Sequence, residues 1–201
     1  MTRRIVLSLL LLALTTIFVG SRYYPLIERI EIVGAAHRSP QEVADLAQVA
    51  YGQPLLWVTR GSVKNLTQDP WILSASVERR LPHTLRITVR ERVPVATDGE
   101  QGYAIDGTVL KGVSDAQIAD SVRLGGWGTS RLDEALELTE LLADRDLKMI
   151  SYTPAGFNLN FVNSTAFVPS VNALKTHWSS FASQQGTRAA VYPWGVSARY
   201  E

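Results

Sequence analysis

The sequence predicts an α+β protein that carries an N-terminal transmembrane helix. Three observations lead to this prediction. Residues 5–20 form an uncharged apolar run. After it, apolar residues recur every two positions in some segments, as in strands, and every three to four in others, as in helices. Finally, 46% of the 201 residues are apolar and 19% are charged, which is typical of a folded chain.

The bulk composition excludes several classes of function. The formal net charge of +1 gives no chain-wide attraction for nucleic acid. The chain has no cysteine, which excludes disulfides, thiolate catalysis and cysteine-type zinc sites.

The apolar run is long enough to be considered as a membrane anchor. A helix over residues 5–20 would span about 24 Å, and its extension to Tyr24 would reach the roughly 30 Å of a hydrocarbon core. Tyr23 and Tyr24 would then lie where an interfacial aromatic belt is expected. We therefore expect a single transmembrane helix at residues 5–24.

Arg3 and Arg4 precede the apolar run, which favours an N-terminus that stays in the cytoplasm. This orientation makes residues 1–4 a cytoplasmic tail and places the rest of the chain outside the cytoplasm. Two alternatives remain open: a cleaved secretory signal, since the apolar length overlaps that class, and a buried core helix.

The first module is expected at residues 25–94. The segment IERIEIVG alternates apolar and charged residues, which predicts a strand ending at Gly34. Ser39 is placed to cap a helix, with Pro40 at its first position and Glu42 completing a capping box. A shorter helix is predicted over residues 60–68.

Two further strands, residues 72–80 and 84–92, complete this module. In the second of them Leu85, Ile87 and Val89 alternate with polar residues and are expected to face the helices. The arginines between them then form a solvated face, and the strand lacks the aromatics that a nucleic-acid-binding sheet would need. Strand, helix, helix, strand, strand predicts a small module with both helices on one sheet face.

The second module is expected at residues 95–201, as a mixed α/β domain with an antiparallel sheet. Asp106-Gly107 predicts a hairpin turn, and residues 153–156 predict a second one. One helix is predicted after Ser130, which would be its N-cap, and another from Pro169 onward. The closing segment RAAVYPWGVSARYE predicts an edge hairpin.

No motif indicates catalysis. The three histidines, His37, His83 and His177, have no metal-ligand spacing, and GGWGTS lacks the lysine of a phosphate-binding loop. One helix face carries Asp133, Glu137, Glu140 and Asp144, which we interpret as a solvated face. We expect no enzyme activity, no cofactor and no metal.

The stretch ERRLPHTLRITVRERVPVA resembles the close of a POTRA domain in the FtsQ/DivIB family of bacterial cell-division proteins. Asp69-Pro70-Trp71 looks like the family's P-W pair before the second strand, and YAIDGTVLKG resembles the opening of its β domain. The resemblance implies a single-pass, non-enzymatic divisome scaffold in the inner membrane at the division site, with its bulk periplasmic.

The resemblance also implies partners. Family members bind an FtsB/FtsL-type coiled-coil pair, which adds a strand to the edge formed by the last strands of the β domain. The matching positions here are Ala190, Val191, Tyr192, Trp194 and Val196. The alternatives are a POTRA-containing export or assembly protein and, from another class, an exported hydrolase.

Overall fold

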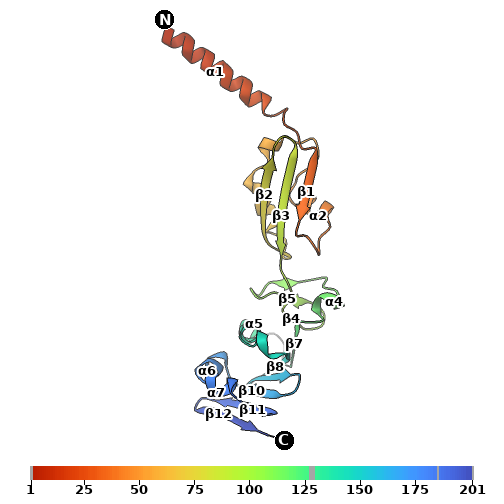
Figure 1. Cartoon of the computed structure of the whole chain (residues 1–201), viewed down its shortest axis with the longest axis vertical. Coiled ribbons are helices and arrows are strands. Elements are labelled where there is room, and N and C mark those ends of the chain that lie inside the picture. Colours follow the sequence, from red (N-terminus) through yellow and green to blue (C-terminus); the bar gives the residue numbers. More distant parts are fainter. Residues whose placement is uncertain (1, 127–129, 185, 201) are drawn as a thin grey trace. The chain divides into compact units, whose positions relative to one another are not determined.

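The computed structural model describes residues 2–126, 130–184 and 186–200. It divides the chain into two compact units, one ending at Arg92 and the other beginning at Val93 (Figure 1).

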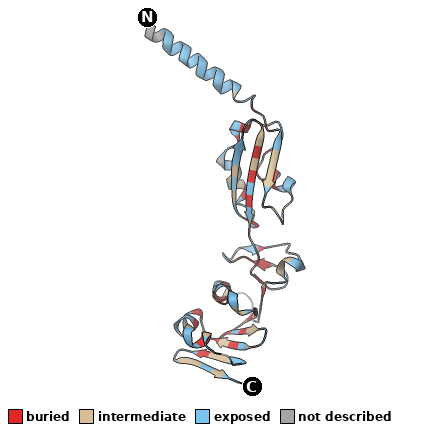
Figure 2. Ribbon diagram, viewed as in Figure 1, coloured by how far each residue is buried: buried red, intermediate tan, exposed pale blue. Residues whose placement is uncertain are grey.

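The first unit begins with helix α1, Thr2–Gly20, whose described apolar side chains are exposed on every side (Figure 2). The helix ends at Gly20 and does not continue to Tyr24 as we had expected. Glycine is a weak helix former, and Pro25 disfavours helical backbone at the residue before it. Among the described residues, no helix combines the length and the apolar character needed to cross a membrane.

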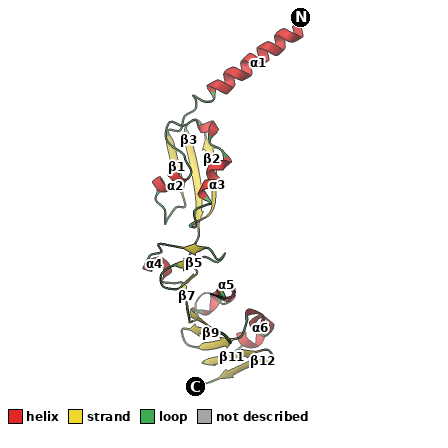
Figure 3. Cartoon of the chain, turned by 180° about the vertical axis from the view of Figure 1, so that it is seen from behind, coloured by secondary structure: helices red, strands yellow, loops and turns green. Residues whose placement is uncertain are grey.

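The rest of the first unit has the expected order of elements, with one added 3₁₀ turn. In chain order they are β1 Arg29–Val33, α2 Pro40–Leu46, η1 Leu55–Trp57, α3 Arg60–Leu66, β2 Ile72–Arg80 and β3 Thr84–Glu91. The sheet order is β1-β3-β2, with β3 parallel to β1 and antiparallel to β2. Helices α2 and α3 lie on the same face of this sheet (Figure 3).

The start of α2 and the buried face of β3 both follow from the local sequence. The Ser39 hydroxyl accepts from the Glu42 N–H, and Glu42 Oε2 accepts from the Ser39 N–H at 2.8 Å, which confirms the predicted capping box. Hydrogen bonds from the Ser39 hydroxyl and backbone lower the pKa of the Glu42 carboxyl. Leu85, Ile87 and Val89 are at most 3% exposed and pack in the core, so the predicted alternation of β3 is confirmed.

The second unit is built on one mixed sheet. Its strands are β4 Ala96–Thr97, β5 Gly102–Tyr103, β6 Val109–Leu110, β7 Val122–Gly126, β8 Leu147–Thr153, β9 Gly156–Phe161, β10 Thr165–Val168, β11 Arg188–Tyr192 and β12 Gly195–Arg199. Its helices are α4 Asp115–Ile118, α5 Leu132–Leu141, η2 Ala143–Arg145, α6 Val171–Thr176 and α7 Trp178–Ala182. The described strands are ordered β12-β11-β10-β9-β8-β7-β4-β5-β6.

The expectation of an antiparallel sheet was wrong for this unit. The pairs β4–β7, β7–β8 and β10–β11 are parallel. Helix α5 connects β7 to β8, and α6 with α7 connects β10 to β11. Each of these crossovers carries the chain back to the end at which the first strand began, so the next strand runs parallel to it. The hairpin at Asp106-Gly107 and the turn between β8 and β9 are confirmed.

The predicted cap of α5 was also wrong. The N-cap position is Arg131, and no side chain caps this helix end. Ser130 lies one residue earlier, while residues 127–129 of the GGWGTS loop lie outside the described residues. The predicted helix from Pro169 is divided in two at His177, which is the C-cap of α6 and the N-cap of α7.

Asp98 fixes the tight turn between β4 and β5. Burial opposes ionisation of its carboxyl, but hydrogen bonds from the Gln101 N–H and the Tyr103 hydroxyl outweigh this, so the pKa is lowered. Beyond this turn, one cluster of buried side chains runs from Ala96 to Val191 and forms the core beneath α5, α6 and α7.

Candidate partner-binding strand

The predicted partner-binding residues lie on the last hairpin of the chain. Strands β11 and β12 pair antiparallel, with Val191 opposite Val196 and Tyr192 opposite Gly195. Pro193 and Trp194 form the two-residue turn between them. The C-terminal edge hairpin expected from the sequence is therefore confirmed.

Strand alternation divides the predicted residues between two faces. Val191 is 0% exposed and belongs to the core, against which Val196 also packs. Ala190 lies on the opposite face, since its neighbour Val191 points inward. Val191 therefore anchors the hairpin to the core, and its side chain is not available to a partner.

The turn presents an aromatic pair. The rings of Tyr192 and Trp194 stack with their centroids 5.3 Å apart and their planes 9° from parallel. Trp194 is 81% exposed, the most exposed large hydrophobic residue described, and Tyr192 is 37% exposed. His177 Nε2 donates to the Pro193 carbonyl at 3.1 Å, which ties the turn to the start of α7. Exposed Tyr and Trp side chains are the type of residue enriched at binding hot spots.

The two end strands of this sheet, among those described, are β12 and β6, and the free edge next to the aromatic pair belongs to β12. Among the described strands β11 has neighbours on both sides, because it pairs with β10 and with β12, whereas β12 pairs only with β11. Ala190, Val191 and Tyr192 therefore lie on an interior strand. Of the five predicted residues, only Val196 lies on the edge strand itself.

Hairpin geometry identifies the backbone groups on this edge. In a hairpin with a two-residue turn the residues that flank the turn share hydrogen bonds, and hydrogen-bonded pairs then alternate along the strands. Tyr192 and Gly195 flank the turn. The N–H and C=O groups of Val196 and Ala198 consequently point to the free edge. Sequence reasoning missed Ala198, although counting from the turn would have found it.

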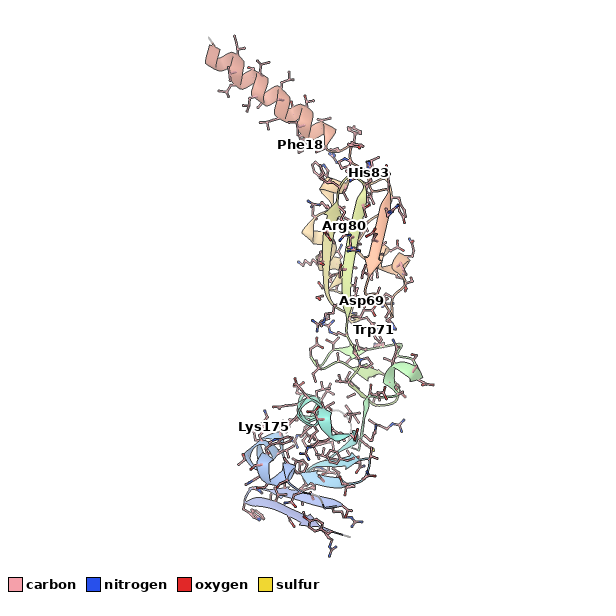
Figure 4. All side chains as sticks on the ribbon, viewed as in Figure 1. Phe18, Asp69, Trp71, Arg80, His83 and Lys175 are labelled. Carbon is pink, nitrogen blue, oxygen red and sulfur yellow. The ribbon has the colours of Figure 1, made fainter. Side chains whose placement is uncertain are left out.

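The other candidate groups have structural partners. His37 stacks on Trp71 at 3.5 Å, and His83 Nδ1 lies 3.1 Å from the Leu26 carbonyl. In the described part of the chain no three His, Asp or Glu residues are grouped as metal ligands would be. Asp133, Glu137 and Glu140 of α5 are exposed as expected, whereas Asp144 is exposed in η2 and not on the same helix. Glu137 forms an ion pair with Lys175 on α6, which is labelled in Figure 4.

Comparison with known proteins identifies a domain family and several relatives of this chain. The family described as "POTRA domain, FtsQ-type" matches residues 26–92, which contain all three strands of the first sheet. The cell division protein FtsQ of Geotalea daltonii is 29% identical over 180 residues, or 76% of this chain. Residues 26–92 therefore belong to the FtsQ-type POTRA family, and the chain is similar to FtsQ proteins beyond this segment. FtsQ of Rhodothermus marinus is 41% identical over 37% of the chain, and DivIB of Staphylococcus aureus is 26% identical over 64%.

These alignments cover 62%, 28% and 31% of the three relatives, so the chain spans less than two thirds of each. All three relatives are named as cell division proteins.

Proposed function

We propose that the chain is a membrane-anchored scaffold of the bacterial divisome that recruits a partner by strand addition to β12. Its partner would be an FtsB/FtsL-type coiled-coil protein of the division machinery. The free edge of β12 beside the exposed Tyr192–Trp194 pair is the observation that carries this proposal.

The proposed anchor is α1 together with residues 21–24. Its 19 residues correspond to roughly 28 Å of helix, and the following turn supplies the remaining length of a bilayer core. Its described apolar side chains are exposed, which is costly in water and favourable in lipid. With the N-terminus in the cytoplasm, both units would lie outside the cytoplasmic membrane.

Strand addition suits the chemistry of β12. An incoming strand would hydrogen-bond to the outward N–H and C=O groups of Val196 and Ala198. Tyr192 and Trp194 would supply apolar contact area at the end of that strand. The edge carries none of the prolines or inward charges that usually protect an edge strand.

Proline at position 198 tests this mechanism. In Ala198→Pro the outward N–H is lost, while the hydrogen bonds between β11 and β12 are retained, because edge strands tolerate proline at such positions. We expect affinity for the coiled-coil protein encoded in the same genome to fall roughly ten- to hundred-fold, measured by interferometry with the full chain in detergent.

Ala198→Ser is the matched control, because it retains the N–H at the same position and should bind like the wild type. Trp194→Ala should weaken binding with unchanged circular dichroism. Wild-type affinity in Ala198→Pro would show that β12 is not the acceptor strand.

Cell imaging tests the role itself. A fluorescent protein fused to the N-terminus should form a band at the division site and remain full length on a blot. An even envelope signal would instead favour an export or assembly protein, and a clipped fusion would contradict the anchor.

A further inference from the structure

One end of the first unit is built around the linker that leaves α1. On one side of the linker the Ile27 N–H donates to the Gln53 carbonyl at 2.9 Å, and the Leu55 N–H donates to the Pro25 carbonyl at 2.8 Å. On the other side the Glu28 N–H donates to the His83 carbonyl at 2.9 Å. Residues 51–57 and 81–83 therefore flank the linker at the end of the unit that carries α1.

This end is unusually apolar for an exposed surface. Eight large hydrophobic residues described between residues 21 and 92 are exposed, and six of them lie here. We call these six the α1-side surface: Tyr23, Tyr24, Tyr51, Leu56, Trp57 and Leu81, with exposed fractions of 74%, 63%, 67%, 43%, 40% and 69%. Such a concentration indicates an interaction site, because scattered exposed apolar residues need no explanation but clustered ones do.

Trp57 joins this surface to the last turn of α1. Its ring meets Phe18 edge-on with 5.4 Å between centroids, and its Nε1–H donates to the Ser21 hydroxyl at 3.3 Å. The Arg22 guanidinium lies 4.9 Å from the centre of the same ring. In Figure 4, Phe18 and His83 mark this end of the unit. Whatever surrounds the last turn of α1 therefore also surrounds Trp57.

The charge of the surrounding segments is mainly basic. Residues 20–27, 46–60 and 79–83 contain four arginines and no Asp, Glu or Lys, and the acidic Glu28 lies beside them with its Oε1 3.5 Å from His83 Nδ1. Arginine with tyrosine and tryptophan is the combination found at the boundary between lipid headgroups and acyl chains. Anionic headgroups attract basic segments of this kind.

We propose that the α1-side surface rests in the interfacial layer of the lipid bilayer that holds α1. This inference depends on the proposed anchor, since a membrane-embedded Phe18 places Trp57 at the bilayer boundary. The first unit is then held against the membrane through residues from three segments, in addition to its covalent link to α1. These contacts would fix the position of the first unit relative to the membrane, whereas a flexible linker alone would let the unit move.

The absence of cysteine allows a direct test, because each introduced cysteine carries the only spin label. The full chain would be reconstituted in vesicles of phosphatidylethanolamine and phosphatidylglycerol, with nitroxide labels on Tyr51→Cys, Leu56→Cys and Leu81→Cys. Collisions with oxygen, which partitions into lipid, are compared with collisions with a water-soluble nickel chelate. Val93→Cys and Val162→Cys are matched controls, because these apolar positions are 70% and 58% exposed outside this surface.

We expect the ratio of oxygen to nickel collisions at residues 51, 56 and 81 to exceed that of both controls severalfold. Ratios equal to the controls would overturn the proposal. Protection from nickel that appears only when a coiled-coil partner is added would also overturn it, because the occupant would then be a protein.

A label on Leu11→Cys separates this inference from the proposed anchor. If residue 11 reports lipid while residues 51, 56 and 81 report water, the anchor stands and the interfacial contact fails. If residue 11 also reports water, the anchor itself fails.

Discussion

Glu91, the last residue of β3, accepts hydrogen bonds from three consecutive backbone N–H groups. Its Oε2 lies 3.0 Å from the Ala36 nitrogen and 2.8 Å from the His37 nitrogen, and its Oε1 lies 3.2 Å from the Arg38 nitrogen. These N–H groups belong to the loop between β1 and α2, so they have no hydrogen-bond partner within a strand or helix. One carboxylate therefore fixes the loop that delivers the chain to the capping box.

We predict that Glu91→Gln loosens this loop. The amide keeps one acceptor oxygen but loses the negative charge and the second acceptor, which should lower stability by about 1–2 kcal/mol. Hydrogen exchange followed by mass spectrometry should show faster exchange in the peptide covering residues 34–40. Glu100→Gln, at an exposed position of the second unit, is the control and should leave this peptide unchanged. Equal exchange in both variants would contradict the role of Glu91.

Single residues were the hardest features to predict from the sequence. The pattern identified Glu91 as part of a recognisable motif but not as a ligand of residues 36–38, because these contacts join positions more than 50 residues apart. The prediction of Ser130 as the cap was wrong because Arg131 takes the N-cap position of α5, and no side chain caps this helix end. The capping box at Ser39 succeeded because all of its groups lie within one turn.

At the scale of elements, Gly34 decides where β1 ends. It follows the strand with a φ of +88°, and a Cβ atom at this position would lie 2.1 Å from the Val89 carbonyl oxygen on β3. Only glycine combines this left-handed backbone with such a close approach to the neighbouring strand.

We predict that Gly34→Ala destabilises the first unit by roughly 2–4 kcal/mol, because strain from the left-handed backbone adds to a clash with a fixed carbonyl. Gly52→Ala is the matched control: its φ is +79°, but no atom lies within 4 Å of the added Cβ. It should cost only about 1 kcal/mol. Urea unfolding of the full chain in detergent would measure both, and equal losses would show that the contact with Val89 is not decisive.

The elements found from the sequence were those with their own periodicity or turn residues. Leu85, Ile87 and Val89 predicted β3, and Asp106-Gly107 predicted the turn between β5 and β6. The short strands β7 and β10 were missed, as their five and four residues give little alternation to read. Without them the two strand-helix-strand crossovers were invisible, and the sheet was taken as antiparallel.

At the scale of the molecule, each buried core draws its residues from one unit. The first cluster contains side chains from Ile27 to Val89, and the second contains side chains from Ala96 to Val191. Residues at the junction divide in the same way. Arg92 donates to the Trp71 and Pro70 carbonyls of the first unit, whereas the Pro94 carbonyl accepts from the Ser121 hydroxyl of the second unit at 2.9 Å.

We therefore predict that each unit folds alone, and that the second needs Val93 and Pro94 to do so fully. Amide NMR spectra of fragments 25–94 and 93–201 should overlay on those of the intact chain in detergent. A fragment covering residues 95–201 should also fold but melt several degrees lower, because it lacks a buried proline and one hydrogen bond worth together about 1–2 kcal/mol. Equal melting temperatures for fragments 93–201 and 95–201 would place the boundary at residue 95, as predicted from the sequence. Unfolded spectra for either unit would mean that the two cores depend on each other, despite sharing no residue.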